Sequence, residues 1–89
     1  MEENIIPDHF AMTVFPSLAN NEIQLAFRNR PSGKSVLKIL DLTGKIVFTD
    51  KILDPLDLLR ISVNELKNGM YYVLFENPRV IYQSNFIKY

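Results

Sequence analysis

The chain has no cysteine, only one histidine and only three glycines among its 89 residues. Without cysteine it can form no disulfide, no thiolate zinc site and no cysteine nucleophile. The glycines are scattered, which excludes a glycine-rich phosphate-binding loop. The histidine, His9, lies in a polar stretch near the N-terminus, whereas a Ser–His–Asp mechanism needs a histidine held by the scaffold. We therefore interpret His9 as an ordinary surface residue.

Neither sign of charge dominates, because ten basic residues balance ten acidic ones. This balance excludes the positive field expected of a domain that binds nucleic acid or an anionic membrane. No apolar run approaches the ~18–20 residues of a membrane-spanning helix. The start, Met1-Glu2-Glu3-Asn4, lacks the positive charge and apolar run of a secretory signal. We expect no nucleic-acid partner, no membrane insertion and no export signal at the front of this sequence.

Carboxylates are the remaining groups that could support chemistry. Asp54 and Asp57 flank Pro55, and a proline-containing turn explains the pair without acid–base work. Together with Asp41 they offer the oxygen ligands that calcium prefers, but their spacing matches no known calcium loop. We therefore expect no metal, no cofactor and no enzymatic activity.

Hydrophobic residues, by contrast, make up 47% of the chain, enough for the modest core of one small domain. Met70–Phe75 is an unbroken apolar run that follows Gly69, and it predicts a central strand with both faces covered. Glu22–Arg28 alternates apolar and polar residues, as a half-buried strand does. Further strands are predicted at Met12–Phe15, Ser35–Leu42, Lys45–Thr49 with a continuation toward Leu53, Leu58–Ser62 and Val80–Tyr89. Turns are predicted at Ser17–Asn21, Thr43-Gly44 and Asn77-Pro78, and at most one helical turn at 63–68.

About seven short strands with short connections predict an all-β fold, a small Ig-like antiparallel β-sandwich over residues 12–89. Residues 1–11 are predicted to be a flexible lead-in. The edge strands of such a sandwich can pair between chains, so a homodimer is a further expectation. The predicted core comprises Ile23, Leu25, Phe27, Leu37, Ile39, Tyr71, Val73 and Phe75.

Five aromatic residues gather late in the chain: Tyr71, Tyr72, Phe75, Tyr82 and Phe86. In a small β domain such residues favour the core, with tyrosine hydroxyls reaching its rim. A sugar-binding platform would instead need several exposed aromatic faces. A protein- or glycan-binding module therefore remains the alternative function. Tyr71 and Tyr72 must point to opposite faces of their strand.

Four stretches, in order, carry a resemblance to a known family. The first is Val14-Phe15-Pro16 followed by Ala19-Asn20, and the second is the strand–turn–strand segment 37–47 around Gly44-Lys45. The third is the segment 61–73, in which Leu66, Gly69 and Tyr71 form a Leu-x-x-Gly-x-Tyr pattern. The fourth is the tail Phe86-Ile87-Lys88. Together they resemble the C-terminal sorting domain, type A, of the type IX secretion system of Bacteroidetes bacteria. The resemblance covers Met12 to Tyr89. Ser17-Leu18 departs from it, standing where the family usually has Asn-Pro.

The resemblance implies a function as well as a fold. Such a domain is the last part of a larger secreted protein and folds as a small Ig-like sandwich. The outer-membrane translocon recognises it after the cargo reaches the periplasm, and a cell-surface sortase then cuts just before it, here in or before residues 1–11. The cargo is secreted or joined to an anionic lipopolysaccharide at the cell surface. The implied partners are the translocon, the sortase and an N-terminal cargo protein, and the domain catalyses nothing. Without an export signal, the sequence is expected to be a fragment of a longer protein or a stand-alone relative.

The resemblance also assigns individual positions. Most of them are the residues that turns and a core require, so we expect them to maintain the fold. Lys45 and the tail, predicted to be exposed, are the candidates for direct contact with the machinery. Removal of Phe86–Tyr89 is accordingly predicted to block export and leave the fold largely intact. The carried-over positions are Pro16, Gly44, Lys45, Leu66, Gly69, Tyr71, Phe86, Ile87 and Lys88.

Overall fold

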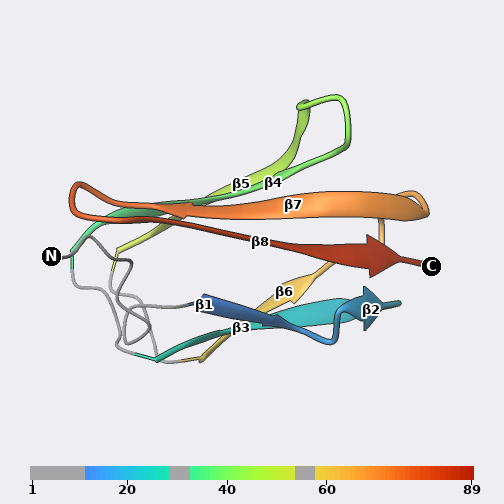
Figure 1. Ribbon diagram of the computed structural model, residues 1–89, viewed down its shortest axis with the longest axis horizontal. Coiled ribbons are helices and arrows are strands. Elements are labelled where there is room, and N and C mark those ends of the chain that lie inside the picture. The colour runs from blue at the N-terminus through green and yellow to red at the C-terminus, as the bar shows by residue number, and fades with distance from the viewer. Residues whose placement is uncertain (1–11, 29–32, 54–57) are drawn as a thin grey trace, which may run out of the picture.

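The computed structural model describes residues 12–28, 33–53 and 58–89, which form eight strands (Figure 1). The strands are β1 (Met12–Phe15), β2 (Leu18–Ala19), β3 (Glu22–Phe27), β4 (Ser35–Leu40), β5 (Ile46–Ile52), β6 (Leu58–Ser62), β7 (Gly69–Glu76) and β8 (Ile81–Lys88). Over these ranges the structure contains no helix that is long and apolar enough to cross a membrane.

The strands form two sheets that pack face to face. One has three strands in the order β1-β3-β6, and the other has five in the order β2-β8-β7-β4-β5. Figure 1 shows the smaller sheet lying below the larger one, with the chain crossing between them several times. Every pairing is antiparallel except β2 with β8. The predicted all-β, Ig-like sandwich is therefore confirmed.

Strand β2 is the element that the sequence did not predict, because Ser17–Asn21 was interpreted as a turn. Leu18 and Ala19 run parallel to Ile87 and Lys88 of β8. The amide of Ile87 donates to the carbonyl oxygen of Ser17 at 2.8 Å. Two residues are too short for a sequence pattern, and their strand conformation depends on the neighbouring edge of β8.

Most predicted turns are confirmed by their backbone hydrogen bonds. The β4–β5 hairpin closes through the Gly44 amide, which donates to the carbonyl oxygen of Asp41 at 3.0 Å. The β7–β8 hairpin closes through the Asn77 amide, which donates to the carbonyl oxygen of Val80 at 3.0 Å. At 63–68, where at most one helical turn was predicted, the chain forms a single turn outside any helix, and the Leu66 amide donates to the Val63 carbonyl oxygen at 3.0 Å.

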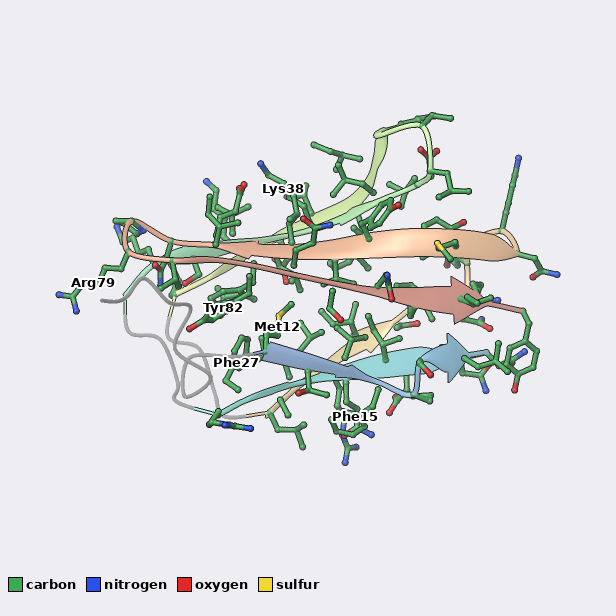
Figure 2. The ribbon with its side chains drawn as sticks, in the orientation of Figure 1. Met12, Phe15, Phe27, Lys38, Arg79 and Tyr82 are labelled. Atoms are coloured by element: carbon green, nitrogen blue, oxygen red, sulfur yellow. The ribbon has the colours of Figure 1, made fainter. Side chains whose placement is uncertain are left out.

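The core lies between the sheets, and all eight residues predicted for it are buried. Toward the β7–β8 hairpin it is aromatic: the ring centroids of Phe27 and Phe75 are 4.8 Å apart, and both lie 6.2 Å from that of Tyr82. Figure 2 shows the side chains of Met12, Phe27 and Tyr82 between the two sheets. Phe86 is buried as well, as expected of an aromatic residue in a small β domain, and the other buried apolar residues are Met12, Val14, Ala19, Ile61 and Val63.

The prediction that both faces of the central strand are covered is wrong. In β7 the side chains of Tyr71, Val73 and Phe75 are buried against the smaller sheet, whereas Tyr72 and Leu74 on the other face are only half-buried. Among the described residues no third layer covers that outer face. An unbroken apolar run does not distinguish a covered face from one shielded only by neighbouring side chains within its own sheet.

Candidate functional site

The positions assigned by the resemblance gather at one end of the five-stranded sheet, where β7 begins and β8 ends (Figure 1). Gly69 lies opposite Lys88, and Tyr71 lies opposite Phe86. The third and fourth motif segments are therefore paired residue by residue, although the β7–β8 hairpin turn lies at the opposite end of both strands.

The first motif segment joins the same end. Phe15-Pro16 is a cis peptide bond, and the chain then enters β2 along the edge of β8. The amide of Tyr89 donates to the carbonyl oxygen of Ala19 at 3.0 Å, and the side-chain amide of Asn20 donates to the carbonyl oxygen of Tyr89 at 2.9 Å. These bonds fix the last described residues against the first motif.

The second motif segment is the β4–β5 turn, which lies beside the start of β7 because Leu40 is opposite Tyr72. One carboxylate oxygen of Asp41, Oδ1, holds the turn together. It accepts the amide of Thr43 at 2.9 Å, the hydroxyl of Thr43 at 2.6 Å and the amide of Lys45 at 3.1 Å. The Lys45 residue is exposed, as predicted, and its backbone is fixed by the turn.

Asp41 provides a pH-dependent prediction. The hydroxyl of Thr43, the backbone amides of Lys45 and Thr43, and the charge of Lys45 hold the pKa of its carboxyl below the ordinary value of 3.8. A lowered pKa in the folded state stabilises the fold above the unfolded pKa, and this contribution is lost as the pH falls through the folded pKa. Wild type should therefore have a higher urea midpoint than Asp41→Asn at pH 7, and the difference should shrink below pH 3.8.

The matched control is Asp50→Asn, which changes another exposed acid on the same hairpin. Its urea midpoint should stay close to that of wild type across the same range. An Asp41→Asn difference that is constant with pH would show that the carboxylate charge does not stabilise the turn.

The third motif segment combines a backbone requirement with a core anchor. Gly69 has φ of 148°, a conformation that side-chain-bearing residues rarely adopt. The Tyr71 ring stacks on Phe86 with centroids 5.5 Å apart, and its hydroxyl donates to the carbonyl oxygen of Lys67 at 2.6 Å. Leu66 is half-buried and packs against the core. These contacts are consistent with the predicted role of the three residues in the fold, which stays a prediction.

Substitution of Gly69 tests the backbone requirement. A Cβ added there would meet nothing within 4 Å, so any cost of Gly69→Ala comes from the backbone conformation and not from a clash. We expect a loss of about 1–3 kcal/mol in the free energy of unfolding, measured by urea titration followed by circular dichroism. Asn68→Ala, at an exposed neighbouring position, should change it by less than about 0.5 kcal/mol. Equal effects of the two substitutions would contradict the backbone explanation.

The tail differs from its prediction. Phe86 is 1% exposed and Lys88 7% exposed, so only Ile87 of the three faces solvent, at 43%. The Lys88 ammonium donates to the carbonyl oxygen of Tyr89 at 3.2 Å. The end of the sequence continues as a regular strand, and its two-residue period turns Phe86 and Lys88 inward. The expectation of an exposed tail is wrong for these two residues.

The remaining candidate groups lie partly outside the part of the chain that the structure describes. His9, Asp54 and Asp57 lie outside the described residues, as does the predicted lead-in at 1–11. Within the described ranges, no group of three or more histidine, cysteine, aspartate or glutamate side chains could hold a metal ion. Tyr71, Phe75 and Phe86 are buried, and Tyr72 and Tyr82 are half-buried, so these five do not form an exposed aromatic platform.

Comparison with known families adds the deciding observation. The model of the family described as the secretion system C-terminal sorting domain matches residues 13–88. The chain belongs to this family. It is a C-terminal sorting signal of the type IX secretion system, and the sorting domains of this family are non-catalytic. Membership implies interaction with the secretion machinery, an N-terminal cargo, and export to the cell surface or beyond. A search of curated proteins finds no match to the sorting domain.

Proposed function

We propose that the translocon recognises the folded sorting domain in the periplasm and that a cell-surface sortase then removes it, cutting in or before residues 1–11. The domain is a substrate of this machinery and catalyses no reaction itself. The observation that carries the proposal is the gathering of the four motif segments at one end of the sandwich, around the Gly69–Lys88 and Tyr71–Phe86 pairs.

Recognition depends on folding because the motif segments are far apart along the chain. Ser17 and Ile87 meet only through the β2–β8 pairing, and Leu40 and Tyr72 only through β4–β7. An unfolded chain would not hold these segments side by side. The machinery therefore reads a surface that exists only once the sandwich has formed.

A glycan-binding function has less support. It would need aromatic faces exposed together, and three of the five late aromatics contribute to the core instead. No described feature favours that alternative over a sorting role.

The experiment fuses the full 89-residue chain to the C-terminus of an exported reporter in a bacterium with a type IX system. The reporter should reach the medium or cell surface, with its mass reduced by that of the sorting domain. The control carries Val73→Asp, which places a charge at a fully buried position and should unfold the domain. That control should stay in the periplasm.

The sorting role, the removal by the sortase and the dependence on folding are each contradicted by a different result. Retention of the unaltered fusion in the periplasm would contradict the sorting role. Release of the reporter with the domain still attached would contradict sortase removal and leave recognition intact. Release of the Val73→Asp fusion in equal amount would contradict the dependence on folding.

A further inference from the structure

The outer face of the five-stranded sheet changes character along its strands. Toward the β7–β8 hairpin it carries an ion pair, with Lys38 Nζ 2.9 Å from Glu76 Oε1, and Figure 2 shows Lys38 pointing away from the smaller sheet. At the end where β7 begins it is apolar. Leu18 is 56% exposed, Ile87 43% and Met70 38%.

These three apolar side chains form one row across three neighbouring strands. Leu18 lies beside Ile87 in the β2–β8 pairing, and Ile87 lies opposite Met70 in the β7–β8 pairing. Their sequence neighbours Ala19, Phe86 and Tyr71 are buried against the smaller sheet. Because alternate side chains point to opposite faces, all three row members point outward.

A hollow adjoins the row at Met70. It has a volume of ≈ 260 Å³ and lies between the β4–β5 turn and the first residues of β7, with Leu42 on one side and Met70 on the other. Leu42 is 64% exposed. The hollow and the row together make a surface that we call the apolar end patch: Leu18, Leu42, Met70 and Ile87. The hollow is also lined by the polar residues Asp41, Thr43 and Asn68. Apolar contacts bordered by polar groups are the usual make-up of a protein–protein contact site.

The motif residues act as the support of this patch. Gly69 and Tyr71 flank Met70 in the chain, and their partners Lys88 and Phe86 flank Ile87. The Leu-x-x-Gly-x-Tyr pattern leaves the Met70 position open, so the motif itself assigns no role to that side chain. The buried motif residues fix the strands, and the fixed strands hold Met70 and Ile87 outward.

The size of the patch bears on what covers it. Four partly exposed apolar side chains make a patch on the order of 300 Å². A stable interface buries about 800 Å² on each partner, so two copies meeting through this patch alone would not form a stable dimer. A transient contact buries less, under about 1,200 Å² over both partners, and a machinery that takes up the domain and then releases it needs only such a contact.

We propose that the apolar end patch is the surface on which a protein of the secretion machinery docks, with an apolar side chain of that protein in the hollow beside Met70. This inference rests on the proposed function, because it names the contact through which the folded sorting domain is read.

The test uses the reporter fusion with the full chain and a double substitution, Met70→Gln with Ile87→Thr, which keeps strand-compatible shapes and removes the apolar surface. The matched control is Leu74→Gln with Ile81→Thr, on the same two strands and the same outer face but at the other end. Leu42→Ser is a second patch variant, placed in the turn and outside any strand. Purified chains of each variant are checked by urea unfolding.

We expect the secreted fraction to fall at least tenfold for the Met70/Ile87 variant and several-fold for Leu42→Ser, with folded chains in both cases. The Leu74/Ile81 control should be secreted like the unaltered fusion. Normal secretion of folded patch variants, or an equal loss in the control, would overturn the docking inference and leave the sorting role standing. If the Met70/Ile87 variant does not fold, Leu42→Ser alone decides between these outcomes.

Failure of the unaltered fusion to leave the periplasm would contradict the proposed function itself. Failure of the docking inference alone would instead leave the unaltered fusion secreted. A second copy as the occupant is tested by light scattering of the purified chain. A dimer that disappears in the Met70/Ile87 variant would overturn the choice of partner.

Discussion

Deletion of Phe86–Tyr89 is expected to unfold the sorting domain, and not to leave the fold largely intact as the sequence alone suggests. Phe86 is 1% exposed and stacks on Tyr71, and replacing a buried phenylalanine by alanine alone costs about 3–5 kcal/mol. The deletion also removes the end of β8 beside which β2 lies, including the bonds from the Ile87 amide to Ser17 and from the Tyr89 amide to Ala19. A small domain has a total stability at the low end of roughly 5–15 kcal/mol, so little would remain.

Circular dichroism and urea titration of the purified chain measure this effect. Phe86→Ala should lower the free energy of unfolding by about 3–5 kcal/mol. Ile87→Ala, at the neighbouring outward position, should lower it by about 1 kcal/mol. A truncated chain with the β spectrum and cooperative unfolding of the complete one would contradict the structural role of the tail. In a secretion assay, loss of export on truncation would therefore not by itself show that the tail contacts the machinery.

Substitution of Tyr71 by alanine is expected to have an effect of similar size. Its ring is 6% exposed and packs on Phe86, so Tyr71→Ala leaves a cavity at the motif end and should cost about 3–5 kcal/mol. Tyr71→Phe keeps the ring and removes only the hydroxyl that donates to Lys67 at 2.6 Å. That variant should lose about 0.5–1.5 kcal/mol.

The pair separates a structural role of Tyr71 from a recognition role. If Tyr71 maintains the fold, the Tyr71→Phe fusion is secreted like the unaltered one, and the Tyr71→Ala fusion is retained because it is unfolded. Retention of Tyr71→Phe with normal urea stability would instead show that the machinery reads the hydroxyl itself.

The fold was predictable where side-chain periodicity is strong. The alternation of Ile23, Leu25 and Phe27 fixes the face of β3, and the Gly44 and Asn77 turns fix two hairpins. Strand β2 was not predictable, because two residues carry no period and their partner lies at the far end of the chain. The outer face of β7 was misjudged because Met70, Tyr72 and Leu74 are apolar yet uncovered by another layer.

The candidate site was predictable in its members and not in its arrangement. The motif residues could be named from their order along the chain, but their gathering at one end depends on strand pairings that no local pattern shows. The inward direction of Phe86 could have been found by extending the two-residue period of the last strand from Tyr82. The same step places Met70 outward once Tyr71 is assigned to the core.

The central claim is that the folded domain is a signal read by the type IX machinery. The most direct measurement is the secreted fraction of the full-chain reporter fusion in cells that contain the type IX translocon and in otherwise identical cells that lack it. The account predicts reporter outside the cell only when the translocon is present. Retention in both strains, or release in both, would contradict it.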